Sequence, residues 1–150
     1  ATLSTWLAGS STAQIHPANK RPPYLVEVVV SAVDQSIATG DVAEVIQVPA
    51  ESIVLFAGCE VLTVSNKVCT ADLGYGGDAD EWINDQDMAT AAHGTIITSG
   101  TTAYVPVMMT TADTIDLTFT VTSGPMTVGI FRVYALIQDI SGVRETSAVA

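Results

Sequence analysis

The stretch Thr114–Thr122, which reads TIDLTFTVT, alternates between apolar and polar residues at every position. Successive side chains of a strand point to opposite faces, so this alternation indicates a β-strand with one buried face. Runs rich in β-branched residues recur along the chain at Tyr24–Ser31, Val42–Val48, Ile53–Phe56, Glu60–Val64, Val68–Leu73, Ala103–Thr110 and Met126–Asp139. Short strands at this spacing predict an all-β fold, an antiparallel β-sandwich or a jelly-roll-like barrel.

Turn and proline signals add detail to this fold. Ser65–Lys67 is typical of a tight turn and predicts a hairpin over residues 60–73. Ala57-Gly58 suggests a bulge or bend between two strands, and Pro106 predicts an edge or bulged strand. The last run, Met126–Asp139, is apolar on both faces, which predicts a central strand or one in a subunit interface.

The two ends of the chain differ from its middle. Residues 1–23 are dominated by Ala, Ser and Thr and close with Pro22-Pro23, which imposes an extended backbone. We interpret residues 1–23 as an extended N-terminal arm, either packed on a neighbour through Trp6 or simply disordered. Residues 24–140 form the predicted β-sandwich domain, and residues 141–150 a polar C-terminal tail.

The composition excludes several classes of partner. Of 150 residues, 48% are hydrophobic and only 14% are charged, with a mean hydropathy of +0.40; soluble domains average about 25% charged residues. The 19 Thr residues supply part of the polar surface, and the low charge density favours an oligomer. A net charge of −11 with five basic residues argues against nucleic acid and against anionic membranes.

The sequence shows no membrane-spanning or secretion signal. No apolar run approaches the roughly 18 residues of a membrane-spanning helix. The N-terminus lacks the basic start and apolar core of a signal peptide. These features favour synthesis in the cytoplasm of the producing cell.

The segment 71–87 concentrates the polar chemistry of the chain, with six of the sixteen carboxylates. Asp78, Asp80, Asp85 and Asp87 are candidate Ca²⁺ ligands, although the spacing does not match an EF-hand loop. The alternative is a solvated turn whose aspartates begin the one short helix, predicted over Asp85–Ala92. We predict no cofactor, and we expect this segment to present Tyr75 and Trp82 at a subunit contact.

No catalytic constellation emerges from the remaining reactive residues. His93 lies where a cation suits the end of the predicted helix, and neither it nor His16 has a serine or cysteine partner in a recognisable motif. Cys59 and Cys69 are either a cross-strand disulfide or two small buried thiols. Lys20 and Arg21 are an ordinary solvated pair, or they tether the arm to an acidic neighbour.

Three segments resemble the head decoration, or cement, proteins of tailed bacteriophages: PYLVE at 23–27, ADLGYGGDAD at 71–80 and GIFRVYALIQD at 129–139. The resemblance covers roughly residues 22–139. It implies a non-enzymatic virion protein on the capsid exterior, bound to the major capsid protein, often as a homotrimer, and reinforcing the shell. The family offers no catalytic residues to carry over.

The chain's own residues supply candidates for such contacts. We expect capsid or subunit contacts at Trp6, Lys20, Arg21, Tyr75, Trp82, Arg132 and Tyr134. The alternative class is a carbohydrate-binding or adhesin-like β-sandwich, with or without calcium. In that case Tyr75, Trp82, Asp78 and Asp80 would form a sugar platform.

Overall fold

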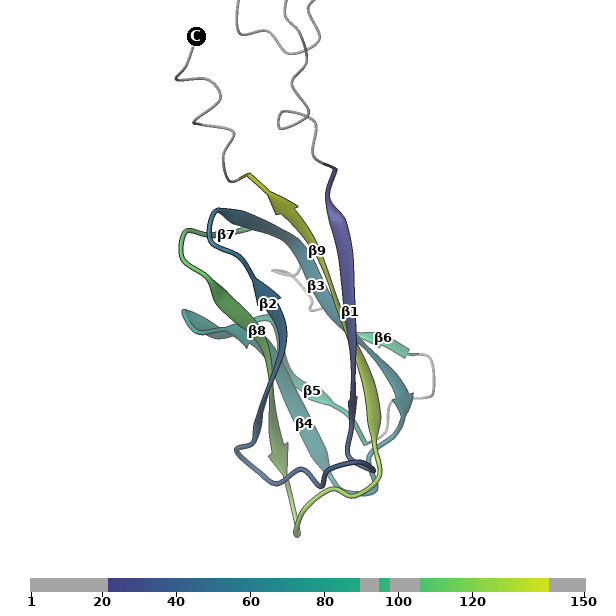
Figure 1. Ribbon diagram of the computed structural model, residues 1–150. Helices are drawn as coiled ribbons and strands as arrows, with labels where there is room; N and C mark the ends of the chain where they lie inside the picture. The colour runs from purple at the N-terminus through teal and green to yellow at the C-terminus, as the bar shows by residue number, and fades with distance from the viewer. Residues whose placement is uncertain (1–21, 90–94, 98–105, 141–150) are drawn as a thin grey trace, which may run out of the picture.

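A computed structural model describes residues 22–89, 95–97 and 106–140. These residues form nine strands, arranged as two antiparallel sheets that pack face to face (Figure 1). The strands are β1 (Tyr24–Ser31), β2 (Val42–Val48), β3 (Ser52–Thr63), β4 (Cys69–Tyr75), β5 (Asp78–Asp87), β6 (Thr95–Ile97), β7 (Val107–Met109), β8 (Asp113–Val121) and β9 (Ile130–Asp139). The predicted β-sandwich is confirmed.

The strand order is that of a jelly roll. The first sheet runs β1-β9-β3, with β6 and β7 each pairing part of the far edge of β3, and the second runs β2-β8-β4-β5. Successive strands from β1 to β4 therefore alternate between the sheets, as two interlocked Greek keys require. This order leaves β1 and β2 as the edge strands on one side of the sandwich.

The core lies between the sheets and follows the period-two pattern of the sequence. On β8 the inward residues Ile115, Leu117 and Phe119 are at most 1% exposed. Across the core, Phe131 of β9 places its ring centroid 5.9 Å from that of Phe119. The apolar positions of TIDLTFTVT therefore bind one sheet to the other.

The hairpin predicted over residues 60–73 is wrong. β3 pairs with β9, β6 and β7, whereas β4 pairs with β5 and β8, so the chain crosses between sheets at Ser65–Val68. The Lys67 N–H donates to Ser65 Oγ within the turn (3.0 Å), and Asn66 bonds to a distant loop. The Asn66 side chain donates to Thr127 Oγ1 (3.0 Å) and accepts from the backbone N–H groups of Thr127 (3.1 Å) and Val128 (3.2 Å). A local turn signal cannot distinguish a hairpin from a crossover, because both reverse the chain.

The short helix is also not found within the described residues. Asp85–Asp87, its expected first turn, form the end of β5, where Thr70 of β4 pairs with Asp87. Residues 90–92 of the expected helix lie outside the described residues. The aspartates serve β-turns and strand ends here: the Asp85 N–H donates to Asp72 Oδ1 (2.6 Å), and the Ala89 N–H to Asp87 Oδ1 (2.8 Å). Pairing with β4 overrides the local helix signal.

Three further expectations concern strands β3, β7 and β9. β9 lies between β1 and β3, so its predicted central position is confirmed. Ala57-Gly58 does not break the chain into two strands, because β3 continues through it, with register shifts at 54–56 and 61–63. Pro106 immediately precedes the short edge strand β7. Within the described residues no helix is long or apolar enough to span a membrane.

Candidate interaction surface

The first sheet carries hydrophobic side chains on its solvent side as well as on its core side. Leu25 of β1, Leu136 of β9 and Phe56 of β3 are register partners across the sheet, opposite in direction to the buried Ala135 and Ile137. The outward hydrophobic residues of this sheet are here named the apolar outer face; they are Leu25, Val29, Ile53, Phe56, Met108, Tyr134 and Leu136. Leu25 is 59% exposed and Val29, four residues along the same strand and on the same side, is 53% exposed.

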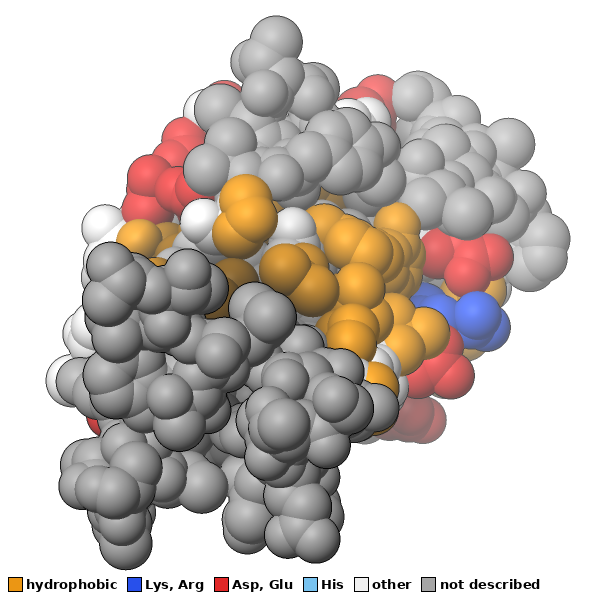
Figure 2. Space-filling view, turned by 90° about the horizontal axis from the view of Figure 1, so that it is seen from above, with side chains coloured by type: hydrophobic (Ala, Val, Ile, Leu, Met, Phe, Trp, Pro, Cys, Tyr) orange, Lys and Arg blue, Asp and Glu red, His pale blue; other side chains and the backbone are white. Residues whose placement is uncertain are grey.

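Seen from the end where β1 begins and β9 ends, hydrophobic side chains gather in one patch (Figure 2). Part of the patch in this view is bordered by acidic side chains and a basic one. The hydrophobic side chains in this view lie next to one another, unlike isolated surface hydrophobics, which need no explanation.

Two aromatic rings pack edge to face in the apolar outer face. The ring centroids of Phe56 and Tyr134 are 6.1 Å apart, with the planes inclined at 73°. Tyr134 lies over Gly58, where an added Cβ would come within 2.5 Å of the Tyr134 hydroxyl oxygen. The absence of a side chain at Gly58 thus leaves room for the Tyr134 ring to pack against the sheet. The predicted contact residue Tyr134 is on this face.

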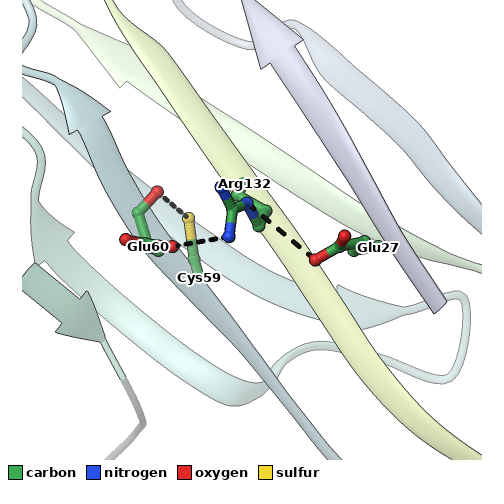
Figure 3. A network of polar contacts seen from close by, with 4 residues as sticks. All are labelled: Glu27, Cys59, Glu60 and Arg132. Atoms are coloured by element: carbon green, nitrogen blue, oxygen red, sulfur yellow. Dashed lines mark hydrogen bonds and ion pairs between the residues drawn. The ribbon is translucent and has the colours of Figure 1, made fainter. Parts of the chain in front are cut away.

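Arg132 places the basic charge of this face between two carboxylates (Figure 3). Its Nη1 lies 3.2 Å from Glu60 Oε2 on β3, and its Nε lies 3.9 Å from Glu27 Oε2 on β1. Both neighbours belong to the same protomer, so Arg132 needs no counter-charge from a partner. Such partly exposed pairs contribute little to stability, about 0–1 kcal/mol. Their effect is to offset one of the two carboxylate charges on this face.

Cys59, the neighbour of Glu60 on β3, is buried on the core side of the sheet. The Cys59 thiol donates to the Glu60 backbone carbonyl at 4.0 Å, as Figure 3 shows. Burial, with a smaller contribution from the Glu60 charge, raises the pKa of Cys59 to about 12. Burial, with a smaller contribution from Asp87, raises the pKa of Cys69 to about 11. Both cysteines are buried free thiols, so the reading without a disulfide is confirmed.

The second sheet has a different solvent side. Its outward positions on β8 and β4 are hydroxyls and carboxylates: Thr114, Asp116, Thr118, Thr120, Thr70 and Asp72, with Glu44 of β2 opposite Asp116. We call this set the acidic outer face. The Thr114 hydroxyl donates to Asp116 Oδ1 at 2.7 Å, which partly offsets the repulsion between Asp116 and Glu44 across the strands.

The segment 71–87 is a β4–β5 hairpin that closes at Gly76-Gly77, with Tyr75 opposite Asp78. Gly74 is needed for this geometry, because a Cβ there would lie 2.1 Å from the Asp78 carbonyl oxygen. The Gly76 N–H donates to Asp113 Oδ2 at 3.1 Å, which ties the hairpin tip to β8. The glycines thus shape a hairpin.

The acidic residues at the hairpin tip interact mainly with each other and with nearby amides. The Asp80 N–H donates to Asp78 Oδ1 (3.3 Å), and the Asn84 side chain to Asp80 Oδ2 (2.5 Å). Hydrogen bonding with Asp80 lowers the pKa of Asp78, while the same contact raises the pKa of Asp80. Desolvation and the contact with Asp78 raise the pKa of Glu81. Among the described residues, no group of three or more His, Cys, Asp or Glu side chains is placed to hold a metal ion.

Trp82 belongs to the core and not to a contact surface. Its side chain is fully buried, and its ring lies 5.8 Å from that of the half-buried Tyr75. Burial therefore overturns the expectation that Trp82 faces a partner. The platform that a sugar would need, with Tyr75 and Trp82 side by side in solvent, is not formed. The run 81–83 (EWI) has no clean alternation that could reveal which side chain turns inward.

Two of the seven expected contact residues, Arg132 and Tyr134, come together on the apolar outer face. Trp6, Lys20 and Arg21 lie outside the described residues. Sequence reasoning missed Leu25, Val29 and Phe56. The signal for Leu25 and Val29 was present, because YLVEVVVS, like the final strand, is apolar on both faces.

No protein-family model matches this sequence, and no curated protein matches it. Similar folds occur in three phage structures. A chain of the acidic stable capsid of Helicobacter pylori bacteriophage KHP30 is 12% identical (TM-score 0.55, covering 79% of this chain and 89% of that one). A chain of the capsid of Ralstonia phage GP4 is 12% identical (0.56, 79% and 84%). A chain of the cyanophage Pam1 capsid asymmetric unit is 20% identical (0.55, 87% and 96%). At these identities the likeness is one of fold.

Proposed function

We propose that this chain is a structural protein of a bacteriophage virion, which binds the outer surface of the capsid as a homotrimer and stabilises the shell. The observation that carries the proposal is the fold likeness to three chains from phage capsid structures, over 79–87% of this chain and 84–96% of each of those chains. Fold alone does not imply function. The resemblance of three segments to decoration proteins is a second, sequence-based argument for the same role.

The unequal outer faces of the two sheets support this role. A protein that coats a shell needs one side that adheres and another that stays in water. The apolar outer face, with its charges paired within the protomer, is suited to contact with an uncharged, apolar surface of the capsid protein. The acidic outer face, rich in threonine, is suited to the solvent side, where like charge keeps neighbouring copies soluble.

A non-enzymatic role agrees with the chemistry of the described residues. Both thiols are buried and have raised pKa values, which makes them poor nucleophiles. The carboxylates at the hairpin tip are exposed and bonded to their own turn. This exposed turn lacks the apolar setting that tunes an acid–base pair for catalysis.

Co-sedimentation with purified capsids tests the proposal. Full-length protein is titrated onto capsids of the phage that encodes it, and the bound fraction is measured. We expect saturable binding at a fixed ratio to the capsid protein, with a native mass of three chains for the free or released protein. A monomer that does not sediment with capsids, and that is retained on a glycan column, would contradict the proposal and favour the carbohydrate-binding class.

A further inference from the structure

A groove of about 530 Å³ opens between β1 and β2. Within the described residues β1 pairs only with β9 and β2 only with β8, so each strand presents a free edge on this side of the sandwich (Figure 1). A free edge offers a row of backbone N–H and C=O groups to any strand that approaches it. The two edges thus face a shared opening.

The groove reaches hydrophobic residues that belong to the core. Val28, Val30, Ala43 and Val45 line it, and all four pack against the buried cluster while remaining partly exposed. By contrast, the inward residues of the central strand β9 are fully buried. The sandwich is therefore incompletely closed on the β1–β2 side, and one more strand would complete it.

The two edges differ in how readily they accept a strand. β1 pairs in unbroken register from Tyr24 to Ser31, whereas the register of β2 shifts between Glu44 and Ile46. Bulges, lysines and prolines are the usual protections of an edge. β1 contains none of the three. The β1 edge is therefore the better template for an added strand.

We propose that the groove binds residues 2–8 (TLSTWLA) of the N-terminal arm of a second copy, as a strand paired with β1. Leu3 and Leu7 lie four residues apart, so both would point to one face of a strand and enter between the sheets. Recognition would be by backbone pairing together with these two side chains, which is the mode called β-augmentation.

Charge supports this occupant. Residues 1–21 contain no Asp or Glu and include Lys20 and Arg21. The groove is lined by Asp34, Asp41 and Glu44 and by no basic residue. Of the sixteen acidic residues all but Glu145 lie in the described part of the chain, together with only two of the five basic ones, Lys67 and Arg132. The segment 2–8 is itself uncharged, so the acidic groove does not repel it, and the basic residues of the arm lie outside that segment.

Length and direction favour a second copy over the arm's own body. Pro22 and Pro23 are exposed and directly precede β1, and consecutive prolines hold the backbone extended. These prolines adjoin Tyr24, at the end of β1 opposite to Val28–Ser31, the β1 residues that line the groove. If extended, 21 residues reach about 70 Å, whereas β1, with 8 residues, is about 26 Å long.

Hydrogen exchange of the full-length protein, without capsids, tests the inference. The probe is the exchange rate of the β1 amides, measured by mass spectrometry at two protein concentrations. The test variant is Leu3→Asp with Leu7→Asp, which adds charge that the acidic groove repels. The matched control is Ser10→Asp with Ser11→Asp, which adds the same charge to the arm outside the pairing segment.

We expect β1 amides to exchange about tenfold faster or more in the test variant than in the control. We also expect their protection in the unmodified protein to increase with concentration, together with the oligomeric mass. Equal exchange in both variants would overturn the inference. So would strong protection in a protein that is monomeric at every concentration, because the arm would then occupy its own groove. This test does not measure capsid binding, so equal exchange in the two variants would overturn the arm contact alone and leave saturable capsid binding as the separate test of the proposed function.

Discussion

The two sheets of the sandwich are equally dry inside and opposite in character outside. The inward residues of their central strands, such as Val133 on β9 and Leu117 on β8, are fully buried. Outward, β1, β9 and β3 present Leu25, Leu136 and Phe56, whereas the middle of the second sheet presents threonines and aspartates. Folding requires only that the inward faces of the two sheets be apolar. The outer difference must therefore be explained by what each sheet meets.

That difference indicates an oriented molecule. Contiguous exposed apolar surface is costly in water and prone to aggregation unless a partner covers it. An acidic, hydroxyl-rich surface lowers the same risk on the other side. If the chain coats a capsid as proposed, the first sheet would meet the partner and the second sheet the solvent.

The strongest test exchanges the character of one face at a time. Leu25→Asp with Leu136→Asp should weaken capsid binding by about 100-fold or more, because burying each leucine contributes roughly 1.5–3 kcal/mol. Binding is measured by co-sedimentation. Thr118→Asp with Thr120→Asp adds the same charge to the acidic outer face and should leave binding unchanged. If the threonine pair loses binding and the leucine pair keeps it, the orientation is reversed.

Alkaline titration probes the shared dry interior. Cys59 and Cys69 have pKa values of about 12 and 11 in the folded protein, against an ordinary value of 9.0. Below pH 9 both states keep their protons, and the thiols contribute their full stability. Between pH 9 and 11 the unfolded chain loses thiol protons that the folded chain retains. The free energy of unfolding should therefore fall by up to about 1.4 kcal/mol per pH unit for each thiol.

Urea denaturation from pH 8 to 11 measures this slope. The control is Cys59→Ala with Cys69→Ala, which retains every other titrating group. We expect a visibly shallower pH dependence in this variant. An identical slope would show that the thiols are already ionised in the folded state or are accessible to water.

Hydrogen bonds between two loops at one end of the sandwich also stabilise the fold. Asn66→Ala removes three side-chain hydrogen bonds that join the β3–β4 crossover to the loop before β9. It should lower the free energy of unfolding by about 1–2 kcal/mol, since the bonds are exposed. Asn66→Asp retains the acceptor oxygen for the Thr127 and Val128 amides and should cost less. A larger loss in Asn66→Asp than in Asn66→Ala would contradict this role.

The smallest expected effect concerns the charge within the apolar outer face. Arg132→Met leaves Glu27 and Glu60 without their shared cation and should cost about 0.5–1 kcal/mol of stability, reduced by added salt. Thermal unfolding at low and high ionic strength measures it. Glu27→Gln removes only the longer contact, at 3.9 Å, and should cost less still. If Glu27→Gln proves the more destabilising change, Glu60 is not the main partner of Arg132.

The all-β class, most strand positions and the faces of the clearest strands follow from the residue pattern along the chain. TIDLTFTVT became β8 with Ile115, Leu117 and Phe119 inward, because alternation along a strand is a local property of the backbone. The sequence also indicated that Gly74, Gly76 and Gly77 let the chain change direction after a strand, but it did not predict the β4–β5 hairpin that they form.

The pairing of the strands could be seen only in the folded protein. It placed β3 and β4 in different sheets, paired Asp87 with Thr70 where a helix was expected, and enclosed Trp82 in the core. It also assembled the apolar outer face from β1, β9 and β3, which are far apart in the chain, and left the β1–β2 groove open. The physical reason is that pairing and burial are contacts between distant residues, and a period read along one segment contains no information about its partner.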